Sequence, residues 1–234
     1  MAALSLAACS GATDGDGSTG ASSSVDPQVF DDVLAAYLPV PGDGARRGLV
    51  VLWFERGVGL KECGGAPPED KYAYRLDQTH YPDLDLITED GFGDYSPDER
   101  TDYGPNPEKC TELGSDKLPS AGAMHALGYE WNEKTLALDN GELAQTLADV
   151  GACLSKVVGV SLPKPVINYY FDHVDGARSK DRVQFLTDEY LRCTPPYFDP
   201  LRKALLEIRP DWVERHREAL ESFASELTAA GYVP

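Results

Sequence analysis

The feature that most constrains the fold is a regular apolar stripe in the second half of the chain. Leu143, Leu147, Val150, Leu154 and Val157 recur at intervals of 4, 3, 4 and 3 residues. This spacing places their side chains on one face of an α-helix. A helix with one apolar face must bury that face against other elements. The stripe therefore predicts a helix over 142–158 that packs in the core of a helical domain.

Further helices are predicted on both sides of this stripe. They cover 26–38, 82–91, 121–127, 166–174, 179–193, 199–208 and 211–230. The first begins at Asp26 and Pro27, which are a good N-cap and a good first helical residue. The segment 46–63 fits either a buried strand or a helix. We prefer the helix, because no partner strand is evident, so the expected fold class is mostly α.

Glycine and proline are expected to separate these helices. Gly128 is predicted to stop the helix that starts at Ala121, and the Asn140-Gly141 pair is predicted to form a turn. Prolines at 163, 165, 195 and 196 are expected to interrupt the chain, and Pro210 is expected to open the last helix. The expected result is an irregular helical domain.

The segment 64–119 is the least regular part of the chain. It contains seven prolines and many acidic residues. A loop region of this length is typically functional, cross-linked or disordered. Because Cys63 and Cys110 bracket most of it, we expect a loop-rich middle region held by a disulfide.

Cysteine number and spacing predict two disulfides. Of the five cysteines, Cys9 has a separate role described below, which leaves Cys63, Cys110, Cys153 and Cys193. None forms a CxxC pair, which argues against a zinc or thioredoxin-like site. Four cysteines allow three pairings, and we prefer Cys63–Cys110 with Cys153–Cys193. The alternative is four buried free thiols, as in the cores of cytosolic proteins.

The N-terminal segment resembles the processing site of a bacterial lipoprotein. The tetrad LAAC at 6–9 is similar to a lipobox, in which the cysteine receives a diacylglyceryl group. Residues 10–24 carry no large apolar side chain, so they cannot bury enough surface to offset their ordering entropy. The resemblance implies a truncated signal peptide at 1–8, a lipidated flexible tether at 9–25, and a start upstream, since no Lys or Arg precedes Cys9. The alternative is a cytosolic protein with a frayed N-terminus.

Two further stretches resemble a recurrent pattern in exported lipoproteins of actinobacteria. They are LADVGACLSKVVGV at 147–160 and PDLDLITEDGFG at 82–93. The sequence departs from the pattern by one extra residue before Cys153. The resemblance implies an extracytoplasmic location and a helical C-terminal half, and it implies no activity. The resemblance is consistent with one extracytoplasmic domain over 26–234. If this domain subdivides, the boundary is expected near residue 119.

Charge excludes one class of partner. The chain has 21 Lys and Arg against 39 Asp and Glu, a net charge of −18. Nucleic-acid binding requires cations against phosphates, so no nucleic-acid partner is expected. The same charge opposes direct adhesion to anionic lipid. The simplest interpretation of the negative charge is an acidic surface that faces solvent. A more specific interpretation is a surface that binds a cationic partner or a metal ion.

Few residues suggest chemistry. The chain has no GxSxG, HExxH or SxxK motif. The acidic run over 83–102 has oxygen ligands suited to calcium but fails the EF-hand spacing. Asp172, His173 and Asp175 offer three potential metal ligands close together, but adjacent helical positions point about 100° apart. No metal site, cofactor or catalytic residue is therefore predicted.

The sequence as a whole favours a membrane-anchored extracytoplasmic lipoprotein. Cys9 is the expected lipid attachment site, and the lipid is the expected contact with the membrane. We expect a binding or interaction module for an unidentified protein or small molecule. The alternative is an envelope hydrolase that uses paired carboxylates from the acidic region.

Overall fold

A computed structural model describes residues 25–42, 44–63, 81–82, 84, 87–88, 91–92, 114 and 116–234. Within these residues the chain is helical and contains no strand, which confirms the predicted mostly α fold. The helices are α1 (Pro27–Tyr37), α2 (Ala45–Cys63), α6 (Ala121–Asn140), α7 (Ala144–Val158), α8 (Val166–Asp175), α9 (Lys180–Cys193) and α10 (Pro195–Ala229). None of the described helices is long and apolar enough to cross a membrane.

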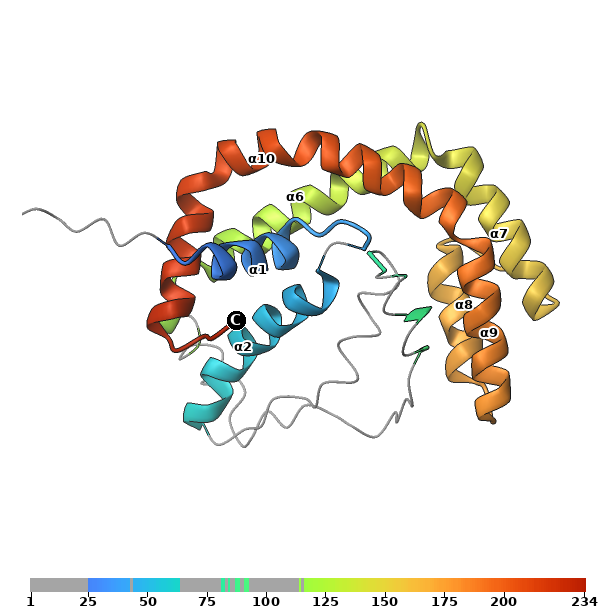
Figure 1. Ribbon diagram of the computed structural model, residues 1–234, viewed down its shortest axis with the longest axis horizontal. Coiled ribbons are helices and arrows are strands. Elements are labelled where there is room, and N and C mark those ends of the chain that lie inside the picture. Colours follow the sequence, from blue (N-terminus) through green and yellow to red (C-terminus); the bar gives the residue numbers. More distant parts are fainter. Residues whose placement is uncertain are drawn as a thin grey trace, which may run out of the picture.

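The long helix α10 connects two groups of helices (Figure 1). Its start lies beside α9, and α7 and α8 pack at the same end of the molecule. Its C-terminal part packs against α1 and α6 at the other end, and α2 packs on α1. Helix α1 contacts α2, α6 and α10, so it is the central element of this second group.

The first two helices follow the predicted signals. The Asp26 side chain accepts a hydrogen bond from the Gln28 amide at 2.8 Å, which caps α1. The ambiguous segment 46–63 is helical, as preferred. A Cβ atom on Gly48 would lie 2.5 Å from the Ala35 carbonyl oxygen, so only glycine allows α1 and α2 to approach so closely here.

The predicted stop at Gly128 is wrong, because α6 continues through it to Asn140. Glycine in a helix interior costs about 1 kcal/mol relative to alanine. Burial of Leu127 and Trp131 on either side of Gly128 offsets that cost, since each large apolar side chain contributes roughly 1.5–3 kcal/mol when buried. The predicted turn at Asn140-Gly141 does end the helix.

The predicted division of the last segment into separate helices is also wrong. The break expected at Pro195 and Pro196 falls just before them, at Thr194, and both prolines lie in the first turn of α10. Helix α10 then runs unbroken through Pro200 and Pro210. Proline removes one backbone hydrogen bond and bends a helix rather than always ending it. Leu205 and Trp212 are buried on either side of Pro210, and this burial holds the helix together. Figure 1 shows that α10 curves along its length.

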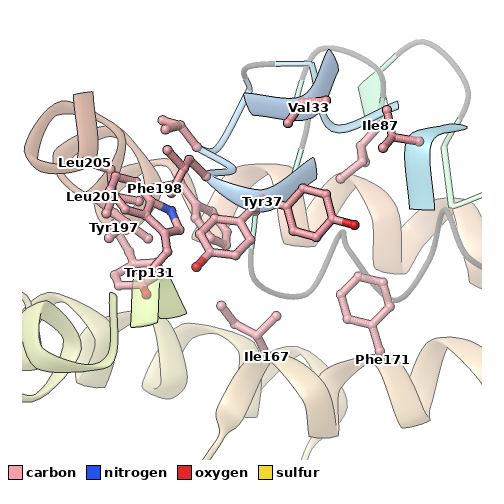
Figure 2. Packing of buried hydrophobic residues seen from close by; sticks show 14 of the residues in the cluster. Val33, Tyr37, Ile87, Trp131, Ile167, Phe171, Tyr197, Phe198, Leu201 and Leu205 are labelled. Atoms are coloured by element: carbon pink, nitrogen blue, oxygen red, sulfur yellow. The ribbon is translucent and has the colours of Figure 1, made fainter. Parts of the chain in front are cut away.

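The core draws large apolar side chains from both groups of helices. Figure 2 shows Val33 and Tyr37 of α1, Trp131 of α6, Ile167 and Phe171 of α8 and the α10 side chains pointing into it. Trp131 is fully buried, and its indole N–H donates to the Pro39 carbonyl oxygen at 2.8 Å. Its ring meets the Trp212 ring edge to face, with centroids 5.5 Å apart. The core is therefore continuous along α10.

A disulfide joins α7 to α9. It links Cys153 and Cys193, whose Cα atoms are 5.8 Å apart, and it matches one of the two preferred pairings. The left-handed Gly159, with φ of +78°, ends α7 directly after the predicted apolar stripe. Leu154, in the middle of that stripe, is fully buried.

Candidate functional site

Three polar side chains meet where α1, α2 and α6 come together, and we call them the Tyr–Glu–His cluster. The Tyr37 hydroxyl donates to Glu55 Oε2 at 2.5 Å. The other carboxylate oxygen, Oε1, lies 2.7 Å from His125 Nε2. Both oxygens of Glu55 thus have a partner, one on α1 and one on α6.

Packing fixes the orientation of this cluster. Tyr37 is buried at the end of α1, and its ring meets the rings of His125 and Phe223 edge to face, at centroid distances of 5.7 and 5.5 Å. The Glu55 side chain is 14% exposed, whereas that of His125 is 59% exposed. The imidazole is therefore held by a largely covered carboxylate while its own ring faces solvent.

A carboxylate that orients an imidazole is the arrangement used in general-base catalysis. It also serves as a polar tie between three helices, and hydrolysis would require a nucleophile or an activated water in addition. Sequence reasoning missed this cluster because Glu55 and His125 are 70 residues apart and belong to no motif. Only the packing of both α2 and α6 against α1 brings them together.

A second polar set, which we call the C-terminal clasp, consists of Asp32, Arg47 and Tyr232. The Asp32 side chain is 2% exposed. It accepts a hydrogen bond from the Tyr232 hydroxyl at 2.9 Å, and the Arg47 guanidinium lies 3.5 Å from its other oxygen. Burial, together with the hydrogen bond to Asp32, raises the pKa of Tyr232 above its usual value. The clasp thus binds the last residues of the chain to α1.

A third polar set lines one side of α6. The Tyr81 hydroxyl contacts Asn132 Oδ1 at 2.6 Å and Thr135 Oγ1 at 2.9 Å. One turn further along, the Tyr197 hydroxyl donates to Asp139 at 2.6 Å. Burial, and then the bond to Asp139, raise the pKa of Tyr197. These contacts attach the segment at Tyr81 and the start of α10 to α6.

Several predicted site residues lie outside the described part of the chain. Cys9 and Cys110 are among them, and Cys63 is described only as the last residue of α2. The lipid attachment and the Cys63–Cys110 disulfide therefore stay predictions. Most of the acidic run over 83–102 also lies outside the described residues.

The weak metal motif at the end of α8 does not form a described cluster. Asp172 and His173 are both exposed, and the side chain of Asp175 lies outside the described residues. Across the described ranges, no three His, Cys, Asp or Glu side chains group as metal ligands. At Gly91, by contrast, the expected helix end is present, because its N–H donates to the Ile87 carbonyl at 2.8 Å.

Among the described residues, the surface features include an open groove on α10 and an exposed apolar row on α6. The groove, of about 560 Å³, lies along the C-terminal half of α10, where Arg215 and Arg217 alternate with acidic side chains. The apolar row is on α6, where Tyr129 is 75% exposed and Leu136 is 48% exposed. Large apolar side chains that share an exposed helix face are typical of interaction surfaces.

No family model, curated protein or solved structure matches this chain. The fold itself defines the class to which the chain belongs, a mostly α-helical protein with a disulfide between two of its helices.

Proposed function

We propose that this chain is an extracytoplasmic lipoprotein, anchored by a lipid on Cys9, that acts as a non-enzymatic binding module. The observation that carries the location is the Cys153–Cys193 disulfide. Disulfides persist in oxidising compartments outside the cytoplasm, where an exported protein resides. The bond therefore supports export, and export in turn supports reading LAAC at 6–9 as a lipobox.

The binding role is supported by the exposed face of α6. Tyrosine is enriched among the residues that dominate binding energy, and Tyr129 presents most of its ring to solvent. The surrounding helices hold α6 firmly, since its opposite face is buried at Met124, Leu127 and Trp131. A rigid helix that displays apolar side chains needs little reorganisation to bind a partner.

A mass spectrum of the mature N-terminal peptide tests the anchor. The expected peptide, taken from membranes of the native host, begins at Cys9 and carries a diacylglyceryl mass. A Cys9→Ser variant is the matched control, and it should leave the membrane fraction. An unmodified N-terminus in the soluble fraction of the wild type would overturn the lipoprotein assignment.

An envelope hydrolase is the second candidate. Its original basis, paired carboxylates in 83–102, stays a prediction, but the Tyr–Glu–His cluster is a described feature that favours hydrolytic chemistry. The test is turnover of p-nitrophenyl acetate by the purified chain. Hydrolysis that His125→Ala abolishes and His173→Ala leaves unchanged would support this candidate, and equal rates in both variants would exclude the cluster.

A further inference from the structure

The asparagine–glycine pair of the chain lies where α6 ends. Asn140 is the last residue of α6, Gly141 is its C-cap, and both are exposed to solvent. The backbone nitrogen that follows an asparagine can attack the side-chain carbonyl carbon and close a five-membered ring. Glycine has no Cβ atom to obstruct this attack. An asparagine that precedes glycine therefore loses its amide more readily than one that precedes a larger residue.

The fold itself favours glycine at this position. A Cβ atom on Gly141 would lie 3.0 Å from the Ala137 carbonyl oxygen, which is closer than an ordinary van der Waals contact. Any other residue would force this oxygen, in the last turn of α6, to move. The Gly141 carbonyl oxygen also accepts a hydrogen bond from the Ala144 N–H at 3.3 Å, where α7 begins. The reactive pair is thus part of the way in which α6 ends.

The other asparagines lack these features. Asn106 precedes a proline, whose nitrogen carries no hydrogen to lose. Asn132 and Asn168 precede residues with large side chains, and they lie inside α6 and α8. A backbone nitrogen inside a helix is held by its hydrogen bond to the carbonyl four residues earlier. Asn140 alone combines a following glycine with a helix end.

Two hydrogen bonds hold the Asn140-Gly141 pair in place. Asn140 Nδ2 donates to the Leu136 carbonyl oxygen at 2.9 Å, and the Gly141 N–H donates to the Leu138 carbonyl oxygen at 3.2 Å. Both bonds belong to the last turn of α6, and the end of a helix opens at a small cost in free energy. Because ring closure uses the Gly141 nitrogen, it proceeds from molecules in which this turn is open.

We propose that Asn140 is a site of spontaneous deamidation, which loosens the connection between α6 and α7. The Gly141 nitrogen loses its proton and bonds to the side-chain carbon of Asn140. The bond from that carbon to Nδ2 breaks, and Nδ2 takes up the equivalent of that proton and leaves as ammonia. Water then opens the ring at either carbonyl, which gives aspartate or isoaspartate without any transfer of electrons to a redox partner. This inference does not depend on the proposed function.

The product fits the closed turn less well than the asparagine does. Aspartate at position 140 lacks the Nδ2 donor and places a negative charge beside the Leu136 carbonyl oxygen. A negative charge is unfavourable at the C-terminal end of a helix, and Asp139 and Glu142 already carry the same charge nearby. Isoaspartate also adds a methylene group to the backbone between the two helices. The turn is therefore harder to close after the reaction than before it.

Peptide mapping by mass spectrometry tests the site. The full purified chain is incubated in mildly alkaline buffer, and the acid form of each asparagine peptide is measured over time. Asn140 should deamidate at least about tenfold faster than Asn132 and Asn168, which corresponds to a barrier lower by about 1.4 kcal/mol. Equal rates at the three asparagines would overturn the proposal.

The same measurement in urea separates the effect of the helix end from that of the following residue. Unfolding should accelerate the reaction at Asn132 more than at Asn140, because Asn132 lies in the interior of α6 and Asn140 at its end. The ratio of the Asn140 rate to the Asn132 rate should therefore fall in urea. An unchanged ratio would overturn the role of the helix end.

The Asn140→Asp variant tests the consequence, since it carries the aspartate product from the start. The Leu143 N–H donates to the Leu138 carbonyl oxygen at 3.0 Å across the turn. Hydrogen exchange at this amide should be about fivefold faster in the variant, in line with a lost hydrogen bond and a negative charge at a helix C-terminus. Asn132→Asp is the matched control, because it adds the same charge at an exposed position inside α6. Equal exchange in Asn140→Asp and the wild type would overturn the proposed loosening.

Discussion

The two ends of α10 lie in regions held together by different interactions. At its C-terminal end, α1, α2 and α6 are joined by polar contacts, namely the Tyr–Glu–His cluster, the C-terminal clasp and the bonds from Ser120 to Glu226. At its N-terminal end, α7, α8 and α9 are joined by the Cys153–Cys193 disulfide and by stacked and edge-to-face aromatic rings.

The aromatic rings of the disulfide region gather around Tyr190. Its ring is fully buried and lies 5.6 Å from that of Phe171 and 5.9 Å from that of Tyr170. The Tyr170 hydroxyl donates to the Leu186 carbonyl at 2.7 Å. Both regions share the apolar core. The first adds charged and hydrogen-bonded contacts to it, and the second adds a disulfide and a cluster of aromatic rings. The two should respond differently to redox state and to pH.

The largest expected effect is loss of the disulfide. The bond closes a loop of 40 residues, and the chain-entropy model gives about 4 kcal/mol for a loop of that length. The variant C153A/C193A should lose that much free energy of unfolding in urea denaturation. Adding reductant to the same variant measures how much any disulfide between the remaining cysteines contributes to the free energy of unfolding. Unchanged stability in the variant would show that aromatic packing alone holds the disulfide region.

Breaking the C-terminal clasp should have the next largest effect. Asp32→Ala removes the acceptor of the Tyr232 hydroxyl and the partner of Arg47, so we expect a loss of about 2–3 kcal/mol in free energy of unfolding, as for hydrogen bonds to charged groups. Tyr232→Phe removes one donor and should lose less. If Asp32→Ala unfolds like the wild type, polar contacts do not stabilise this end of α10.

High pH should weaken the disulfide region through its tyrosines. Burial raises the pKa of Tyr170, Tyr190 and Tyr197 above the usual value of about 10. Above that pH the unfolded chain releases protons that the folded chain retains, so stability is complete below about pH 10 and falls as the pH rises further. The slope is about 1.4 kcal/mol per pH unit for each tyrosine.

Urea denaturation between pH 9 and pH 11, roughly spanning the usual tyrosine pKa of about 10, checks this expectation. The Tyr197→Phe variant should show a shallower slope than the wild type, because one of the four tyrosines with a raised pKa, which include Tyr232 of the clasp, is absent. Tyr129→Phe is the control, since Tyr129 is mostly exposed. Equal slopes in the two variants would contradict the role of Tyr197.

The smallest expected effect is at the Tyr–Glu–His cluster. Tyr37→Phe removes one hydrogen bond to Glu55 while the ring packing remains, so the loss should be about 1 kcal/mol. His125→Gln should change stability less, because the His125 side chain is mostly exposed. Thermal unfolding of both variants measures the difference, and a larger effect for His125→Gln would reverse this ranking.

Local signals in the sequence predict the helices well. The stripe from Leu143 to Val157, the cap at Asp26 and the turn at Asn140-Gly141 concern residues within a few positions of one another. The predictions fail at Gly128 and Pro210, where local preference favours a break. At these positions the burial of neighbouring side chains outweighs that preference, and burial depends on contacts between distant segments.

The polar sites could not be predicted for the same reason. Asp32 and Tyr232 are 200 positions apart, and Ser120 and Glu226 are 106 apart. Their residue types are common and their spacing follows no motif. The Cys153–Cys193 pair is the exception, because the cysteine number and the size of the loop restrict the choices.

The C-terminal clasp has a mechanical consequence. Val25 lies two residues before α1, and Tyr232 near the other end of the chain is bonded to Asp32 within α1. A force that pulls on the chain before Val25 reaches α1 first, and α1 passes it to α2, α6, α10 and the C-terminal residues together. Helix α1 should therefore not separate from the other helices first. The helices that α1 contacts should resist a force applied before Val25 together.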